Sequence, residues 1–233
     1  MKTLTYQRRR SQLETYFDRT AVDAWTRLTS DRPVSRIRAT VRAGRDRMRS
    51  ILLDGLPEDL KGCRLLDAGC GTGALSVAAA ERGADVVAID LSPTLIKVAR
   101  ERLPAQLGDG KIEFRVGDMV DPSLGKFDYV VAMDSIIHYR AEDMVAMIAN
   151  MADLAERKVL FTFAPRSILL TLMHLAGRLF PRSDRAPSIE PIRERTLRRK
   201  IGAHADLERW QITGSERVSS GFYTSQSMEL TRS

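Results

Sequence analysis

One short stretch of this sequence brings together an aspartate and three glycines. Asp67 ends an apolar run, and Gly69, Gly71 and Gly73 follow it at alternate positions, before an Ala/Val-rich segment. Glycines let the backbone approach a ligand closely, because they have no Cβ. A helix that starts beyond them offers its free N–H groups to that ligand. Strand, tight turn and helix in this order are typical of the first unit of a nucleotide-binding α/β sheet.

The spacing of the glycines distinguishes between two classes of cofactor. It is G-x-G-x-G with an aspartate two residues before the first glycine, and not the G-x-G-x-x-G of dinucleotide enzymes. A pyrophosphate favours the helix N-terminus with no anion beside it. S-adenosylmethionine has no phosphate, and it carries a sulfonium cation and a zwitterionic amino-acid end. The Asp67 carboxylate therefore favours S-adenosylmethionine over NAD.

A second acidic residue ends the next apolar segment. Asp90 lies 17 residues after Gly73 (90 − 73), where a carboxylate can accept hydrogen bonds from ribose hydroxyls. A turn that only packs a helix on a strand would explain the glycines but neither acid. Through D-A-G-C-G-T-G and V-V-A-I-D-L-S, the sequence resembles the class I S-adenosylmethionine-dependent methyltransferases.

This resemblance implies an α/β fold with a Rossmann-like, seven-stranded sheet, helices on both faces and a last strand antiparallel to the rest. Alternation of apolar and polar residues at 210–218 and 222–231 predicts the terminal antiparallel hairpin. The other predicted strands cover 62–67, 86–90, 112–116, 127–134 and 158–163, and the predicted helices cover 74–82, 93–103, 141–155 and 192–202.

Two regions are additional to that sheet. Residues 4–29 and 35–53 have apolar residues at helical spacing with arginines between them. We expect an N-terminal helical arm or lid of residues 1–56 over the carboxyl ends of the strands. Packing on the edge of the core and binding to a membrane surface are the alternatives. An apolar, arginine-bearing stretch at about 166–190 predicts a helical insertion after the fifth strand, at the acceptor site of a methyltransferase domain of residues 57–233.

Composition limits the class of protein further. The chain of 233 residues has two cysteines, at a spacing that fits neither a disulfide framework nor a zinc site, and no apolar run near the ~20 residues that cross a bilayer. We expect a reduced cytoplasmic protein without a signal peptide and without a metal site. The net charge of +7 lies largely in residues 1–49 and 178–200. It suits a nucleic acid, an anionic membrane, an acidic substrate or simply a solvated surface.

The class I resemblance also implies further cofactor contacts. In that class an acidic residue after the third strand binds the exocyclic amine of adenine, and an apolar neighbour packs on the ring. Asp118 and Met119 match these positions, although a Gly-Asp pair also favours a turn. The expected cofactor-binding residues are Asp67, Gly69, Gly71, Asp90, Leu91, Asp118, Met119 and Met133, the last of them at the end of the fourth strand.

Short motifs outside the glycine turn indicate the methyl acceptor. They are Tyr16-Phe17-Asp18 with Trp25, Asp134-Ser135-Ile136-Ile137-His138-Tyr139, Phe163-Ala164-Pro165 and Ser219-Ser220-Gly221-Phe222-Tyr223-Thr224-Ser225-Gln226. Taken together, these motifs resemble those of the magnesium-protoporphyrin O-methyltransferases of (bacterio)chlorophyll biosynthesis, over nearly the whole chain. The resemblance implies that S-adenosylmethionine donates a methyl group to one propionate of magnesium protoporphyrin IX, with magnesium present only as part of the porphyrin.

A propionate acceptor needs little acid–base catalysis. Carboxylates titrate near ~4 and are ionised at neutral pH, so the main task is to hold the oxygen against the methyl group. His138, after the fourth strand, is the first catalytic candidate, either binding the propionate or ligating the substrate's magnesium; capping or packing is the alternative. Tyr16 is the second, as a hydroxyl donor or as an interior aromatic of its helix. We expect His174 to pack and His204 to lie at the surface.

Other interpretations of these residues stay open. A quinone, another small molecule or RNA could be the acceptor, although the arginines are not interleaved with the aromatic residues that stack bases, so we expect no nucleic acid partner. A non-catalytic porphyrin- or membrane-binding module is a third hypothesis, and the presence of Asp67, Asp90 and Asp118 argues against it. Further expected partners are the large subunit of magnesium chelatase and an anionic photosynthetic (intracytoplasmic) membrane, bound peripherally.

Overall fold

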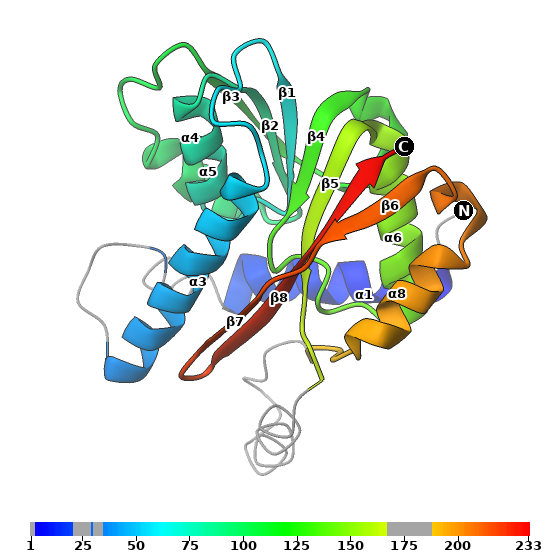
Figure 1. Cartoon of the computed structure of the whole chain (residues 1–233). Coiled ribbons are helices and arrows are strands. Elements are labelled where there is room, and N and C mark those ends of the chain that lie inside the picture. Colours follow the sequence, from blue (N-terminus) through cyan, green and yellow to red (C-terminus); the bar gives the residue numbers. More distant parts are fainter. Residues whose placement is uncertain (1–2, 21–28, 30–34, 167–187) are drawn as a thin grey trace.

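The structure is a computed structural model that describes residues 3–20, 29, 35–166 and 188–233. Its strands form one mixed sheet, which is coloured along the chain in Figure 1. They are β1 (Arg64–Ala68), β2 (Asp85–Asp90), β3 (Lys111–Val116), β4 (Phe127–Ala132), β5 (Ala155–Phe163), β6 (Trp210–Gly214), β7 (Arg217–Ser220) and β8 (Tyr223–Arg232). The order across the sheet is β3-β2-β1-β4-β5-β8-β6, and β7 pairs with β8. Strands β1 to β5 are parallel, and β8 is antiparallel to its neighbours.

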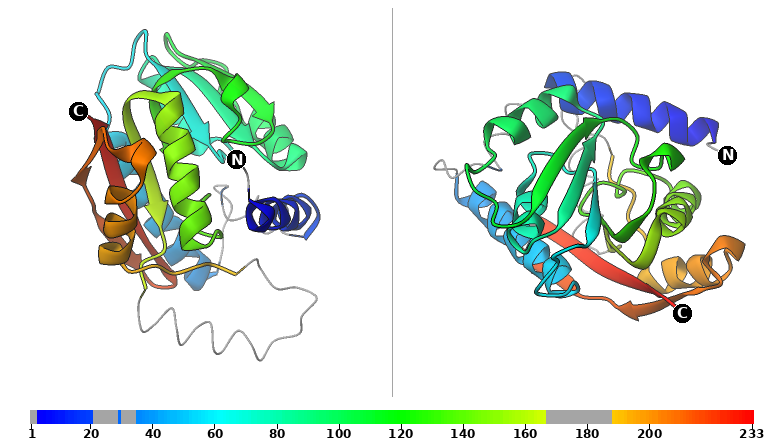
Figure 2. Two further views of the ribbon diagram at one scale, coloured as in Figure 1. Left: turned by 90° about the vertical axis from the view of Figure 1, so that its right-hand side faces the viewer. Right: turned by 90° about the horizontal axis from the view of Figure 1, so that it is seen from above.

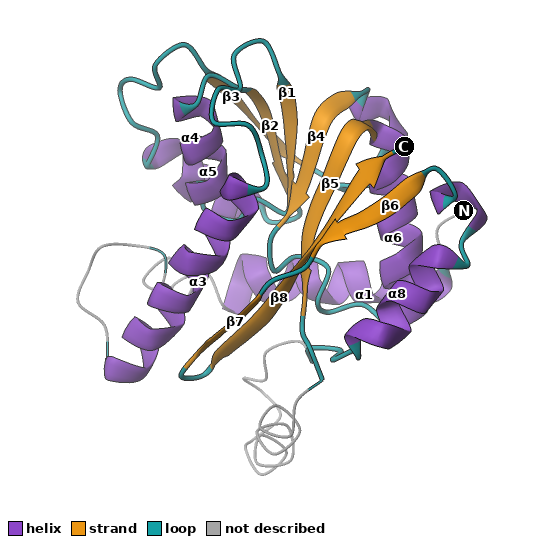
Figure 3. Cartoon of the chain, in the orientation of Figure 1, coloured by secondary structure: helices purple, strands orange, loops and turns teal. Residues whose placement is uncertain are grey.

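Helices cover both faces of the sheet (Figures 2 and 3). They are α1 (Leu4–Thr15), α3 (Arg36–Asp54), α4 (Ala74–Glu81), α5 (Pro93–Glu101), α6 (Ala141–Leu154) and α8 (Glu194–Gly202). Helices α3, α4 and α5 lie on one side and α6 and α8 on the other, while α1 runs past the carboxyl ends of the parallel strands. None of the helices in the described part of the chain has the length and apolar character needed to span a bilayer.

The core explains why the middle of β1 is apolar. Leu65 and Leu66 point to opposite faces, as successive strand residues must. Leu65 packs with Met48 and Leu75 from α3 and α4, whereas Leu66 packs with Met144 from α6. A central parallel strand is buried on both faces, so polar residues have a place only near its ends.

The structure confirms the expected fold, with differences in detail. The predicted helix at 35–53 is α3, and Ser35 caps it by accepting a hydrogen bond from the Arg38 N–H. The strand predicted at 210–218 is divided into β6 and β7, because the Ser215 hydroxyl donates to the Ser227 carbonyl and the Glu216 N–H donates to the Ser227 hydroxyl. The sheet therefore keeps the expected path of seven strands and gains β7 as an eighth.

The N-terminal helices differ from the expectation in length and place. The α-helix predicted over 4–29 ends at Thr15 and continues as a π-helical turn, η1 (Tyr16–Thr20). Helix α1 takes the expected position over the carboxyl ends, but α3 packs along α4 and the β7–β8 pair instead. Most of the predicted insertion at 166–190, with His174, and also Trp25 lie outside the described residues.

The close packing of α3 on β8 predicts a stability difference between two helical glycines. A Cβ at Gly44 would lie 2.5 Å from Cδ1 of Tyr223 and 3.1 Å from Cβ of Ser220, whereas a Cβ at Gly202 of α8 would meet nothing within 4 Å. We expect Gly44→Ala to lower the free energy of unfolding in urea by about 1–3 kcal/mol. Gly202→Ala should leave it unchanged or raise it by up to ~1 kcal/mol. Equal effects of the two substitutions would contradict the role of this packing.

Candidate active site

The turn after β1 consists of backbone in a conformation that suits glycine. Gly69, Gly71 and Gly73 have φ values of +86°, +56° and +81°. At Gly69 a Cβ would lie 2.4 Å from the Cβ of Ser135, so a larger residue would displace the segment after β4. Gly73 stands directly before α4, whose first N–H groups face the same edge. The turn is therefore a cradle of bare backbone at the carboxyl end of β1, which a Cβ would fill.

Asp90 fastens this turn to the end of β2. Its Oδ2 accepts a hydrogen bond from the Gly71 N–H and its Oδ1 accepts one from the Ser92 N–H, both at 2.9 Å. Burial raises the pKa of this carboxyl, and the backbone N–H groups partly offset that effect. A carboxylate offers about four acceptor positions, so Asp90 keeps capacity for ribose hydroxyls. Its contact with ribose stays a prediction.

Asp67 is buried beneath the turn. Its Oδ2 accepts a hydrogen bond from the Ser76 hydroxyl of α4 at 2.5 Å. Burial raises the pKa of the Asp67 carboxyl to about 7; the Ser76 hydroxyl acts against this rise and the nearby Asp90 adds to it. A cation at the turn would favour the ionised form. The role of Asp67 beside a positively charged ligand stays a prediction.

Asp118 is shared between the cofactor side and α1. Its Oδ1 accepts hydrogen bonds from the Tyr6 hydroxyl at 2.6 Å and from the Val120 N–H at 3.2 Å. The second of these is the turn contact that was the alternative role for Asp118. Arg10 Nε lies 3.8 Å from the other oxygen, and the Tyr6 ring stacks on Tyr139 with centroids 5.3 Å apart. Tyr6 was not predicted from the sequence, because nothing local marks it as the partner of a residue 112 positions away.

The remaining predicted cofactor residues lie at the same edge. Met119 is buried, and its Cε is 3.3 Å from the position of a Cβ on Gly69. Leu91 directly follows β2 and packs on the core with α6, whereas Met133 directly follows β4 and packs on the core with α4. The structure therefore brings the predicted residues together at the carboxyl ends of β1 to β4, and their contacts with a cofactor stay predictions.

His138 and Tyr16 both contact the ring of one phenylalanine, Phe17. His138 is buried, its Nδ1 lies 3.4 Å from the Ser188 carbonyl oxygen, and its ring centroid is 6.0 Å from that of Phe17. Phe17 in turn meets Tyr16 edge to face at 5.2 Å. Burial raises the pKa of the half-buried Tyr16, so its hydroxyl keeps its proton at neutral pH. His138 does not cap α6, since Arg140 is the capping residue.

Asp18 of the same N-terminal motif fixes the position of these aromatic residues. Its Oδ1 accepts hydrogen bonds from the Thr94 hydroxyl at 2.7 Å and from the Thr94 N–H at 3.2 Å. Thr94 lies in the first turn of α5, where free N–H groups attract a carboxylate. The π-helical turn η1 is thereby anchored to α5, the helix that follows β2. His204, expected at the surface, is half-buried beside Asp206, with 4.0 Å between Nδ1 and Oδ2.

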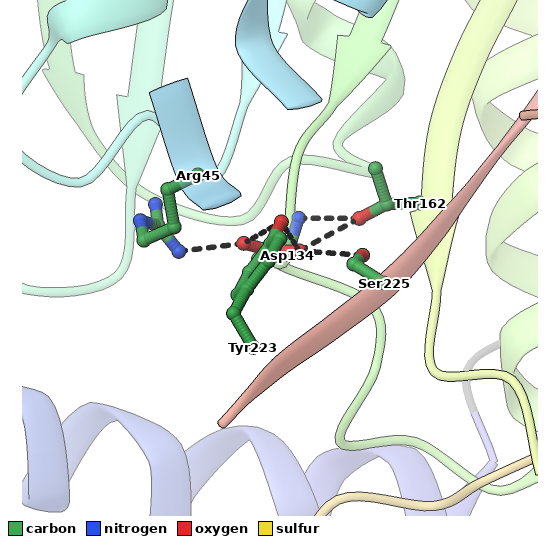
Figure 4. A network of polar contacts seen from close by, with 5 residues as sticks. All are labelled: Arg45, Asp134, Thr162, Tyr223 and Ser225. Carbon is green, nitrogen blue, oxygen red and sulfur yellow. Dashed lines mark hydrogen bonds and ion pairs between the residues drawn. The ribbon is translucent and has the colours of Figure 1, made fainter. Parts of the chain in front are cut away.

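A polar network around Asp134 is another part of the site that was not predicted from the sequence (Figure 4). The carboxylate, 5% exposed, pairs with Arg45 of α3 at 2.6 Å. It also accepts hydrogen bonds from the hydroxyls of Tyr223, Ser225 and Thr162 at 3.0–3.1 Å. Its own N–H donates to Thr162 at 2.7 Å. Among the described non-glycine residues, Asp134 alone has positive φ, at +53°.

The signal that could have found this network was present in the D-S-I-I-H-Y motif. Aspartate enters the left-handed region more readily than most residues, and an aspartate directly after a buried strand is well placed to receive donors. The partners, however, come from α3, β5 and β8, and no spacing in the sequence links them. In the described part of the chain, no group of three or more His, Cys, Asp or Glu residues could hold a metal ion.

Comparison with known proteins identifies relatives for the whole chain. A family model described as the C-terminus of magnesium-protoporphyrin IX methyltransferase matches residues 132–232, and a methyltransferase-domain model matches 65–158. Magnesium-protoporphyrin O-methyltransferase of Rhodobacter capsulatus is 48% identical over 96% of this chain and 97% of its own length. Crystal structures of the Synechocystis PCC 6803 magnesium protoporphyrin IX methyltransferase with bound SAH and SAM are 31% and 28% identical. Their TM-scores are 0.80 and 0.77; the first covers 96% of this chain and 99% of its own, the second 97% of each.

The raised pKa of Asp67 predicts a pH-dependent stability of the chain without ligand. From about pH 4 to about pH 7 the folded chain keeps a proton on Asp67 that the unfolded chain releases, so the free energy of unfolding falls as the pH rises. Asp67→Asn cannot titrate. As the pH rises from 5 to 8, the free energy of unfolding of Asp67→Asn in urea should increase by on the order of 2 kcal/mol relative to that of the wild type. The exposed Asp206→Asn should follow the wild type, and a constant difference between wild type and Asp67→Asn would refute the prediction.

Proposed function

The chain belongs to the magnesium-protoporphyrin O-methyltransferase family, and on this premise we propose that it transfers a methyl group from S-adenosylmethionine to one propionate of magnesium protoporphyrin IX. The observation that carries the proposal is the glycine cradle with Asp67 beneath it and Asp90 beside it, in a chain 48% identical to a named relative over nearly its full length. The products are the monomethyl ester and S-adenosylhomocysteine.

The residues around the turn fit this cofactor. The cradle at Gly69 has no room for a Cβ, and Asp67 beneath the turn suits a cation. Asp90 is a half-buried carboxylate with acceptor positions to spare, and Asp118 is a buried carboxylate after β3. When bound, S-adenosylmethionine would supply a methyl group attached to a sulfonium. A nucleophile takes the methyl group, and the sulfur then leaves as a neutral thioether. The chain itself binds, orients and excludes water, because an ionised propionate needs no proton removed.

His138 and Tyr16 are the residues we place at the acceptor propionate. The Tyr16 hydroxyl stays protonated and can donate a hydrogen bond to a carboxylate oxygen. His138 can donate from one ring nitrogen or ligate the substrate's magnesium as neutral imidazole. Phe17 contacts both rings and supplies an apolar surface suited to a flat macrocycle. Together they would hold the propionate oxygen rather than activate it.

Charge and exposed apolar side chains bear on where the protein acts in the cell. We propose a cytoplasmic protein that binds the photosynthetic membrane peripherally and receives its substrate from the large subunit of magnesium chelatase. The net charge of +7 supports the membrane contact, as do Ile37, 55% exposed in the arginine-rich α3, and Phe222, 52% exposed between β7 and β8. Co-sedimentation with anionic vesicles tests the membrane part, and a chain that stays in the supernatant at low salt would contradict it.

A direct assay tests the reaction. Enzyme, methyl-labelled S-adenosylmethionine and magnesium protoporphyrin IX should yield labelled monomethyl ester, identified by chromatography. A quinone and an RNA, offered in place of the porphyrin, should remain unlabelled. Label in either of these with none in the porphyrin fraction would reject the proposed acceptor, and no label in any acceptor would reject the enzymatic function.

Replacing His138 separates a catalytic role from a structural one. We expect His138→Ala to lower kcat by roughly 10- to 100-fold, as loss of a hydrogen bond to a charged group does. The dissociation constant for S-adenosylhomocysteine should change by less than about threefold, because His138 lies on the acceptor side. His204→Ala, away from the site, is the matched control and should keep wild-type kcat. Equal losses in turnover and cofactor affinity would indicate that His138 only supports the fold.

A further inference from the structure

Two arginines near the acceptor candidates are held by acids of the protein itself. Arg9 of α1 lies 3.2 Å from Glu190, and Arg45 of α3 lies 2.6 Å from Asp134. The porphyrin carries two propionates, and the methyl group is transferred to only one of them. A cation is the strongest hydrogen-bonding partner for the other carboxylate. That cation has to come from another position at this edge of the sheet.

Helix α3 carries two further arginines in line with Arg45. Arg42 lies three residues before Arg45 (45 − 42), and Arg38 lies seven residues before it (45 − 38). A helix turns by about 100° and rises by about 1.5 Å per residue, so the Cα–Cβ bond of Arg38 is within about 20° of that of Arg45. Arg42 is about 60° around the helix from Arg45. The three residues form one stripe, which we call the α3 arginine stripe.

The pairing of Arg45 with Asp134 shows which way the stripe faces. Asp134 directly follows β4, in the segment that also carries His138, and Figure 4 shows the Arg45 guanidinium reaching it from α3. The first half of α3 extends beyond the carboxyl ends of the parallel strands to the tip between β7 and β8 (Figure 1). Arg42 and Arg38 therefore stand on the same side of α3 as Asp134 and further out from the sheet.

Both outer arginines of the stripe are accessible to a ligand. Arg38 is exposed and Arg42 is half-buried. They are four residues apart on one helix, a spacing at which like charges repel and destabilise the helix. Asp46, the nearest acid along α3, lies 3.0 Å from Arg49. An anion that lies across Arg38 and Arg42 would relieve this repulsion, and the guanidinium fork matches the two oxygens of a carboxylate.

We propose that Arg38 and Arg42 bind the propionate of magnesium protoporphyrin IX that is not methylated. The two propionates project from the same edge of the macrocycle, so the second one stays near the site when the first is held at His138 and Tyr16. The proposal rests on the proposed function, since it concerns the same acceptor. It makes the outer part of α3 a specificity element, because a porphyrin without the second carboxylate loses this contact.

The two arginines should contribute unequally to binding. Water screens an ion pair at an exposed position, so Arg38→Ala should weaken porphyrin binding by only about two- to fivefold. Hydrogen bonds to a charged group are worth more where the site is partly buried, so Arg42→Ala should weaken it by about 10-fold. Arg42→Lys keeps the charge but not the fork, and it should recover part of the lost affinity.

Three porphyrins that differ only in their carboxylates test the proposal. Magnesium protoporphyrin IX has two, its monomethyl ester keeps only the propionate that is not methylated, and its dimethyl ester has none. Their dissociation constants are measured by fluorescence titration with S-adenosylhomocysteine present, so that no methyl group is transferred. The wild type should bind the monomethyl ester more tightly than the dimethyl ester by about 10-fold or more. The arginine variants should lose affinity for the first two porphyrins and bind the dimethyl ester within about twofold of the wild type.

Arg36→Ala is the matched control. Arg36 and Arg38 are both exposed in the first turn of α3, but two residues turn a helix by about 200°, so the two side chains leave α3 on opposite sides. Arg36→Ala should leave all three dissociation constants within about twofold of the wild type. The melting temperature of each ligand-free variant is measured in parallel, and it should match that of the wild type.

The possible outcomes lead to distinct conclusions. A wild-type chain that binds none of the porphyrins refutes the proposed function. Wild-type binding with no preference for the monomethyl over the dimethyl ester, or with unchanged affinity in both arginine variants, overturns only the role of the stripe. A loss confined to magnesium protoporphyrin IX would assign the arginines to the reacting propionate instead. Equal losses for all three porphyrins, or an equal loss in Arg36→Ala, would assign them to the fold or to general surface charge, and would also overturn the proposal.

Discussion

The pairing of the buried Asp134 carboxylate with Arg45 is the interaction on which the acceptor side depends. A buried carboxylate is stable only when it is paired with a cation and its remaining acceptor positions receive hydrogen bonds. If one partner of such a pair is removed, the other remains as an uncompensated buried charge, which destabilises the fold. Here the guanidinium and three hydroxyls fill those positions. Helix α3, strand β5 and strand β8 are thereby joined at the segment that carries Ser135 and His138.

The two acids of the cofactor side are stabilised in different ways. Asp90 accepts hydrogen bonds from two backbone N–H groups, which partly offset the rise in its pKa caused by burial, so it is part of the turn whether or not a ligand is bound. Asp67 is buried with one hydroxyl partner, and its raised pKa shows that its charge is not fully compensated. A cationic ligand would lower that pKa, so binding of the sulfonium donor and release of a proton are linked near neutral pH.

Local features of the site were predictable from sequence, and long-range ones were not. The glycine turn, Asp67 and Asp90 lie within one strand–helix–strand unit, so their spacing along the chain is enough to place them together. Tyr6 and Arg45 reach Asp118 and Asp134 across 112 and 89 positions, and helical periodicity says only which face of a helix is apolar, not which acid it meets. The π-helical turn at Tyr16 was missed for the same reason, since Asp18 is held there by α5.

The antiparallel strand between β5 and β6 has a consequence for how the molecule is made. Tyr223 and Ser225 of β8 bind an aspartate 89 and 91 positions earlier in the chain. A nascent polypeptide leaving the ribosome can form the glycine turn as soon as β1, α4 and β2 emerge. The segment after β4 must wait until β8 has been synthesised, because two of its donors do not yet exist. The polar network around Asp134 is thus completed only when the last strand of the sheet has been made.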